Sequence, residues 1–148
     1  MLRIYLDNCC YNRPFDDLAQ AKIKDEAEAK IFIQTLIKNK SLVLYSSFML
    51  LYEINDNPFV NKKEHISKFV HEYSSVHVGE GRKEDIKPIS EEILRTGVKE
   101  KDAIHLSCSI IAECDYFITT DKRILKCQIE KIKILNPIDF VKVWREIL

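Results

Sequence analysis

The sequence predicts a three-layer α/β/α fold with a mostly parallel central sheet, and three observations support this class. Short apolar runs alternate along the chain with longer amphipathic segments, as in repeated β–α units. The length of 148 residues allows a real core but is too short for two ordinary domains, so a single domain over 1–148 is expected. Hydrophobic residues make up 46% and charged residues 31%, with three Gly and four Pro, which indicates a well-ordered globular chain.

The predicted elements follow from periodicity and from turn residues. Short apolar runs predict strands at 3–6, 42–45, 75–78, 115–120 and 132–135. Apolar residues at three-to-four spacing, with capping and breaking residues, predict helices at 22–39, 46–54, 59–73, 88–95 and 101–114, and a last one from Pro137. Residues 55–58 are typical of a turn, 79–81 of a flexible connection, and Gly97 of a helix end. Strands separated by helices favour a parallel sheet with helices on both faces.

Charge and cysteine content exclude several classes of protein. The 23 basic and 23 acidic residues cancel, so a nucleic-acid site has to be a local patch. No apolar stretch approaches the roughly 18 to 20 residues that span a bilayer, and the N-terminal residues lack a signal-peptide pattern, so no membrane association is expected. The five cysteines are odd in number and show no CxxC spacing. Free thiols in a reducing cytoplasm are therefore predicted.

Four acidic residues occupy corresponding places in this pattern. Asp7 follows the first predicted strand, Asp121 follows the fourth, Glu53 lies on the helix after the second, and Asp102 lies in the first turn of the helix that enters the fourth. Parallel strands end at one edge of a sheet, and a helix that leads into a strand begins at that same edge. The four carboxylates are therefore expected to converge there.

Converging carboxylates point to a metal site. They would repel one another and take up protons unless a hard cation offset their charge, and clustered oxygen ligands suit Mg²⁺ or Mn²⁺. Glu53 lies in a largely apolar helix, where an inward carboxylate without a partner would be costly. A divalent ion can acidify a water molecule and neutralise charge on a phosphodiester. Phosphodiester hydrolysis is the reaction that this set of residues predicts.

Simpler explanations exist for each residue taken alone. An isolated Asp is common as a helix cap or turn residue. Asp56, one helical turn beyond Glu53, can flank the site but is predicted to lie outside it. The other acidic residues placed on the surface or in turns are Asp16, Asp17 and Asp139.

The neighbours of the four acids also have two interpretations. His105 can reach substrate from the face of Asp102, but a packed, hydrogen-bonded histidine is the preferred interpretation. Adjacent Cys9 and Cys10 suit a single tetrahedral ion poorly and are predicted to be buried small side chains. Phosphate contacts and plain solvation are equally good explanations for the basic residues near the acids, namely Arg13, Lys101, Lys122 and Arg123.

Three stretches, LDNCCYNRPFDD, SSFMLLYEI and KEKDAIHLSCSIIAECDYFITTDKRIL, resemble in order the motifs of PIN domains, the ribonuclease family of VapC-type toxins. The resemblance implies that Asp7, Glu53, Asp102 and Asp121 are the metal-binding acids and that Thr119 is a supporting hydroxyl residue. Asn8 departs from the pattern, because many relatives carry a hydroxyl residue there. Asn8 still offers hydrogen bonds, and Arg13 is a candidate substrate contact.

The resemblance implies a metal-dependent endoribonuclease that acts as the toxin of a toxin–antitoxin pair, with RNA as substrate and an antitoxin protein as partner. Because no basic stripe is evident, we expect selectivity to depend on the geometry of a homodimer. One alternative is an inactive PIN-like module that binds RNA or protein. Another is a haloacid-dehalogenase-like phosphatase with Asp7 as nucleophile, although Cys9 stands where that class carries a second Asp.

Overall fold

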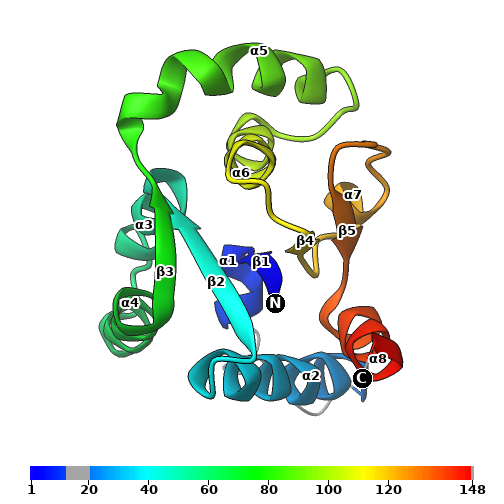
Figure 1. Ribbon diagram of the computed structural model, residues 1–148. Helices are drawn as coiled ribbons and strands as arrows, with labels where there is room; N and C mark the ends of the chain where they lie inside the picture. Colours follow the sequence, from blue (N-terminus) through cyan, green and yellow to red (C-terminus); the bar gives the residue numbers. More distant parts are fainter. Residues whose placement is uncertain (13–20, 148) are drawn as a thin grey trace.

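The computed structural model describes residues 1–12 and 21–147 and has a five-stranded, all-parallel sheet at its centre (Figure 1). The strands lie in the order β3-β2-β1-β4-β5. Their bounds are Leu2–Leu6 for β1, Leu42–Ser47 for β2, Ser74–Val78 for β3, Tyr116–Ile118 for β4 and Lys133–Leu135 for β5. In the central strand, Ile4 lies opposite Leu44 on one side and Tyr116 on the other. The predicted fold class is confirmed.

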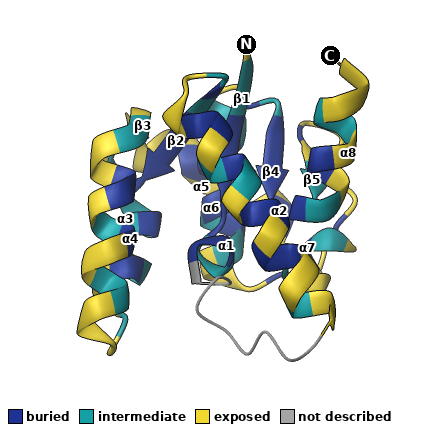
Figure 2. Ribbon diagram, turned by 90° about the horizontal axis from the view of Figure 1, so that it is seen from below, coloured by how far each residue is buried: buried dark blue, intermediate teal, exposed yellow. Residues whose placement is uncertain are grey.

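Helices cover both faces of the sheet. Their bounds are α1 Asn8–Asn12, α2 Ala21–Lys38, α3 Phe48–Asn55, α4 Val60–Tyr73, the short 3-10 helix η2 Glu80–Arg82, α5 Lys83–Leu94, α6 Glu100–Ile111, α7 Lys122–Leu125 and α8 Pro137–Ile147. Residues of α1 to α4 and α8 share one buried core, and residues of α5, α6 and α7 share the other. In Figure 2 the central strands β1, β2 and β4 are mostly buried, whereas the helices change from buried to exposed around their circumference.

The two cores follow from the alternation of side chains along each strand. In β1, Ile4 and Leu6 enter the core beneath α2 and α8, while Tyr5 points to the opposite face. There the ring of Tyr5 stacks on Phe117 of β4, with ring centroids 5.3 Å apart. Tyr5 is therefore held rigidly one residue before the end of β1, beneath the helix that carries Asp102.

Several local predictions hold, and others are corrected. Ser47 caps α3, because its Oγ accepts a hydrogen bond from the Leu50 N–H at 3.2 Å. The helix expected at 88–95 begins at Lys83 instead, so Pro88 lies inside α5 rather than at its start. Pro88 removes one backbone donor, but Ile86 and Ile93 of the same helix are buried against α6, and this burial offsets the loss. Gly97 lies in the turn after α5 with φ of 96°, a conformation that favours glycine.

The short helices α1 and α7 were not predicted, because one turn of helix has too few residues to show a period. All five cysteines are free thiols, as predicted. Among the described residues, no helix combines the length and apolar character needed to cross a membrane.

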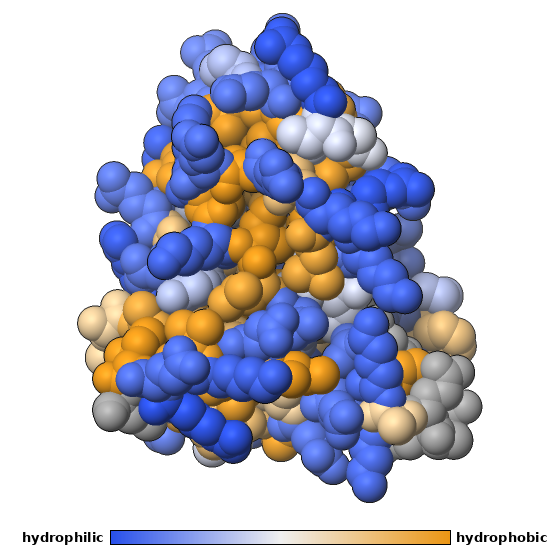
Figure 3. All heavy atoms as spheres, turned by 90° about the vertical axis from the view of Figure 1, so that its right-hand side faces the viewer, coloured by the Kyte–Doolittle hydropathy of each residue, from blue (hydrophilic) through white to orange (hydrophobic). Residues whose placement is uncertain are grey.

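The right-hand side of the view in Figure 1 is a mixed surface. Figure 3 shows apolar atoms exposed there between charged side chains. A cavity of about 310 Å³ on the molecule includes Ile89, Ile93, Ile110 and Ile129 in its lining. The edge strand β5 has only three residues, which limits its capacity to pair with another chain.

Candidate metal centre at the carboxyl edge of the sheet

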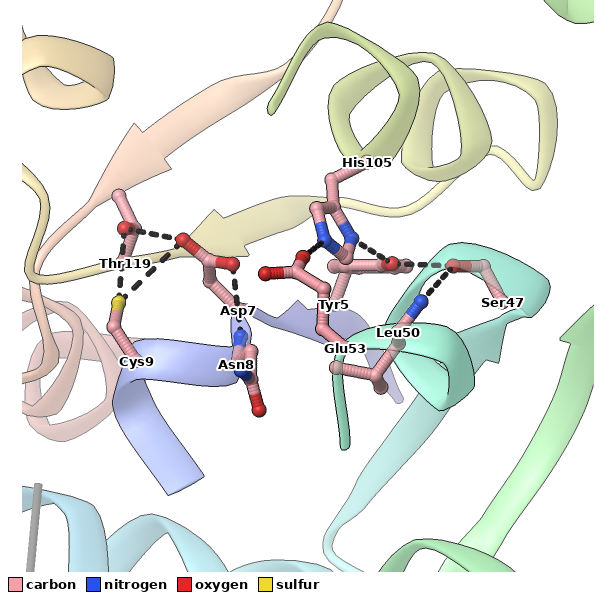
Figure 4. Close-up of polar contacts among 9 residues, drawn as sticks. All are labelled: Tyr5, Asp7, Asn8, Cys9, Ser47, Leu50, Glu53, His105 and Thr119. Atoms are coloured by element: carbon pink, nitrogen blue, oxygen red, sulfur yellow. Dashed lines mark hydrogen bonds and ion pairs between the residues drawn. The ribbon is translucent and has the colours of Figure 1, made fainter. Parts of the chain in front are cut away.

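The order of the strands creates a crevice next to β1. From β1 the chain continues to β2 and β3 on one side, whereas β4 and β5 lie on the other side. The direction of winding therefore reverses between the neighbouring strands β1 and β4. In open α/β sheets ligands bind at such a point, outside the carboxyl ends of the strands. Asp7 follows β1 and Thr119 follows β4, so both lie at this reversal (Figure 4).

Asp7 is buried and held by hydrogen bonds on both carboxylate oxygens. Its side chain is only 5% exposed. The backbone N–H of Asn8 donates to Oδ1 at 2.8 Å, and the Thr119 hydroxyl donates to Oδ2 at 2.8 Å. The Cys9 thiol also donates to Oδ2, at 3.4 Å. These contacts fix the orientation of the carboxylate without placing a positive charge beside it.

Thr119 connects Asp7 to Asp121. Its Oγ donates to Asp7 and accepts a hydrogen bond from the Asp121 N–H at 3.0 Å. The carboxylate of Asp121 caps α7, because its Oδ1 accepts from the N–H groups of Arg123 at 2.8 Å and Ile124 at 3.4 Å. Asp121 is therefore a helix cap, and its place beside Thr119 also puts it at the same edge of the sheet as Asp7.

Glu53 is held by a chain of hydrogen bonds that joins side chains of four elements, α3, α6, β1 and β2. His105 of α6 is fully buried, and its Nε2 bonds to Oε1 of Glu53. Its Nδ1 bonds to the Tyr5 hydroxyl at 2.6 Å, and that hydroxyl bonds to the Ser47 Oγ at 2.6 Å. Figure 4 shows the side chains in this sequence. The packed, hydrogen-bonded interpretation of His105 is confirmed.

The protonation states of His105 and Tyr5 follow from burial and from the neighbouring charges. Burial lowers the pKa of His105, but the hydrogen bond that its ring donates to Glu53 and the charges of Asp7, Glu53 and Asp102 raise this pKa by more, so the net shift is upward. Burial keeps the pKa of Tyr5 well above its ordinary value, so its hydroxyl stays protonated. When His105 is charged, both ring nitrogens donate, to Glu53 and to Tyr5, and Tyr5 donates to Ser47.

The structure brings Asp7, Glu53 and His105 together most closely, with one potential ligand atom from each within 4.8 Å of the others. Asp102 is half-buried, and its pKa is raised to about 6 by burial and by the charges of Asp7, Asp121 and Glu53, against a smaller opposing effect of His105. All four predicted acids therefore interact electrostatically around Asp102. Arg13, like Asp16 and Asp17, lies outside the described residues.

The donor set fits a hard divalent cation. Carboxylate oxygens are the ligands that Mg²⁺ and Mn²⁺ prefer. The pKa of Asp102 is raised first by burial and then by repulsion from the other carboxylates, and a cation would relieve this repulsion. Sequence reasoning did not find Tyr5, which bonds to His105, or Ser47, which bonds to the Tyr5 hydroxyl. Alternation along β1 predicts that Tyr5 and Leu6 point to opposite faces of the sheet. Only the packing of α6 brings the imidazole of His105 to the hydroxyl of Tyr5.

Comparisons with known proteins identify the fold. No family model matches this chain, and neither does any curated protein. One solved structure that is similar is VapBC2 from Rickettsia felis bound to a DNA fragment from their promoter. The TM-score is 0.55 at 10% sequence identity, over 91% of this chain and 98% of that chain. At this identity the likeness concerns the fold, so the chain shares its fold with a chain of the VapBC2 complex.

Two clefts adjoin the acidic residues. The first, of about 430 Å³, includes Glu53 and Asn8 together with side chains from α3, α4 and α6, and we call it the aromatic cleft. The second, of about 510 Å³, we call the basic cleft, and it is lined by Lys99, Asp121, Lys122, Arg123 and Lys126. Four positive charges around one acidic residue make the basic cleft a local cationic patch on a chain of zero net charge.

Asp102 makes the stability of the metal-free protein depend on pH. A carboxyl group whose pKa is raised on folding stabilises the fold below its unfolded pKa, near 3.8, and this contribution is lost as pH rises through about 6. We expect the melting temperature in EDTA to fall over this window, and Asp102→Asn to remove the fall. The pKa of His105 is also raised on folding, from 6.5, so its contribution to stability is likewise lost as pH rises, but at a pH above 6.5.

Differential scanning fluorimetry between pH 4 and 8, with EDTA and with Mn²⁺, measures this effect. Mn²⁺ should raise the melting temperature of the wild type most above pH 6, and should raise that of Asp102→Asn much less. If the melting temperatures of the wild type and of Asp102→Asn depend on pH in the same way, with and without Mn²⁺, then Asp102 does not interact electrostatically with the other carboxylates.

Proposed function

We propose that this protein is a divalent-metal-dependent endoribonuclease. The observation that supports the proposal is that potential ligand atoms of Asp7, Glu53 and His105 lie within 4.8 Å of one another at the reversal point of the sheet. Beside them the pKa of Asp102 is raised, first by burial and then by the charges of Asp7, Asp121 and Glu53. We infer that Asp7, Glu53, Asp102 and Asp121 act together. These residues would hold one or two Mg²⁺ or Mn²⁺ ions. When bound, such an ion supplies Lewis-acid chemistry, acidifying water and offsetting the negative charge that develops on a phosphodiester.

The residues of the chain have separate tasks in this proposal. Thr119 and the Asn8 N–H orient the carboxylate of Asp7, and His105 orients that of Glu53. The basic cleft lies beside Asp121 and can hold the phosphates that flank the scissile bond. No covalent nucleophile is required, so hydrolysis by water is the expected reaction.

RNA is the proposed polymer, and regulation by a protein partner is proposed with it. Support comes from the resemblance to VapC-type toxins and from the fold shared with a chain of the VapBC2 complex. A toxin of this kind is kept silent by an antitoxin that covers the metal-binding carboxylates. Acidic residues on the partner would be expected opposite the basic cleft, because a silencing segment has to displace phosphates from the same cations.

The test is cleavage of a mixed RNA pool by purified protein in Mg²⁺, in Mn²⁺ and in EDTA. We expect discrete products that require metal and that disappear with chelation. Readdition of Mn²⁺ to the chelated sample should restore them, which separates metal loss from irreversible unfolding. A metal-binding protein that leaves every RNA in the pool intact would favour the inactive binding module.

A further inference from the structure

The aromatic cleft is continuous with the metal centre. Its lining residues are Asn8, Glu53, Asp56, Asn57, Pro58, Phe59, Lys62 and Lys101. Because Glu53 belongs to both, a group bound in the cleft lies directly beside the carboxylates. The cleft is formed by the turn between α3 and α4 together with Lys101, at the start of α6.

One exposed aromatic ring lines this cleft, and a second lies next to it. Phe59, in the lining, is 62% exposed. Tyr52 is outside the lining but in contact with the lining residue Lys101, and it is 55% exposed. The Asn57 Oδ1 accepts a hydrogen bond from the Phe59 N–H at 2.9 Å, which fixes the turn that presents the Phe59 ring. A large ring that stays exposed to water does not contribute the stabilisation that its burial would give. A turn that holds such a ring beside the carboxylates therefore points to a ligand with a flat surface that can cover the ring.

A lysine accompanies each ring. The Nζ of Lys62 lies 4.9 Å from the ring centroid of Phe59, and the Nζ of Lys101 lies 5.1 Å from that of Tyr52. Each lysine lies over one face of its ring, so a base would stack on the opposite face. Proteins use rings together with cations to bind single-stranded nucleic acid, since the ring stacks on a base and the cation neutralises a phosphate. Asp56 is also in the cleft and would repel a phosphate, so the base edge rather than the backbone should face it.

We propose that the aromatic cleft is a nucleotide subsite that takes an unpaired RNA base next to the cut. The proposal rests on the endoribonuclease function and adds that Phe59 and Lys62 are the residues that hold a base beside Glu53. The base stacks on Phe59, its neighbour stacks on Tyr52, and Lys62 and Lys101 pair with the intervening phosphates. A duplex does not fit, because its bases are stacked on one another and their faces cannot reach the rings.

The experiment measures binding without cleavage. Asp7→Asn protein is titrated in Mg²⁺ against a fluorescent, unstructured RNA oligonucleotide and against the same sequence in a duplex, and anisotropy is recorded. Phe59→Leu, made in the Asp7→Asn background, should weaken single-strand binding by about tenfold and leave duplex binding unchanged. Phe59→Trp should restore it, because the larger ring still stacks. Lys101→Gln should reduce the salt slope of binding by about one.

A matched control is Ile31→Ala, which removes an exposed apolar side chain of α2 outside the cleft lining. This variant should bind like its parent. Equal binding by Phe59→Leu and its parent, or tighter binding of duplex than of single strand, would overturn the subsite. The subsite would also be overturned if light scattering showed that Phe59→Leu alone changes the mass of the particle in solution, because the ring would then belong to a contact between protein chains.

The two proposals fail separately. If the wild type cuts no RNA but single-strand binding depends on Phe59, the subsite stands and the nuclease function fails. If the wild type cuts RNA in a metal-dependent way and Phe59→Leu binds and cuts normally, the nuclease function stands and the subsite fails.

Discussion

Asp7→Asn should reduce metal-dependent RNA cleavage by roughly 10²- to 10³-fold, the scale on which losing one charge-stabilising group lowers turnover. Asp7 is the most buried of the four acids, and its two oxygens are oriented by the Asn8 N–H and the Thr119 hydroxyl. Asparagine keeps the shape but removes the charge that would hold the cation. Because Thr119 can accept a hydrogen bond as well as donate one, the amide finds a partner and the fold should survive.

Cleavage rates of Asp7→Asn, Asp7→Asn with Asp121→Asn, and the wild type provide the measurement. Asp139→Asn is the matched control, since Asp139 is exposed on α8 and lines neither cleft. It should cleave at the wild-type rate. Circular dichroism and the melting temperature check that the fold is kept. Full cleavage by the double variant would refute the metal centre.

The second large effect is expected from His105→Ala. This change opens a cavity in a fully buried site and leaves the hydroxyl of Tyr5 and the carboxylate of Glu53 without their shared partner. We expect the free energy of unfolding to fall by about 2 to 4 kcal/mol. Tyr5→Phe removes only the bond to His105 and the bond to Ser47, and should cost about 1 kcal/mol.

Urea denaturation measures these losses, with His71→Ala as control because His71 is exposed on α4. The control should lie within about 0.5 kcal/mol of the wild type. If His105 also positions Glu53, the affinity for Mn²⁺ should drop by about 10- to 100-fold at a temperature where the variant is folded. If His105→Ala has the same stability and Mn²⁺ affinity as His71→Ala, the hydrogen bonds of His105 contribute neither to folding nor to metal binding.

Most of the fold could be predicted because its determinants are local. Short apolar runs at 3–6 and 42–45 and three-to-four spacing in 22–39 predict these strands and this long helix to within a few residues. The exceptions are instructive. Pro88 is an ordinary start signal, yet it lies inside α5, because the helix gains from burying Ile86 on the earlier turn. Single-turn helices such as α7 depend on a cap at Asp121 rather than on a period.

The sequence by itself determined that Asp7 and Asp121 follow strands and that Glu53 and Asp102 lie on helices at the same edge, because strand ends and helix starts in a parallel sheet share an edge. Only the tertiary structure decided that β1 and β4 are neighbours, that Tyr5 and Ser47 hold His105 on Glu53, and that Phe59 is presented beside the centre. Such contacts join residues far apart in the chain, and the pKa of Asp102 depends on their summed burial and charge, which no local pattern encodes.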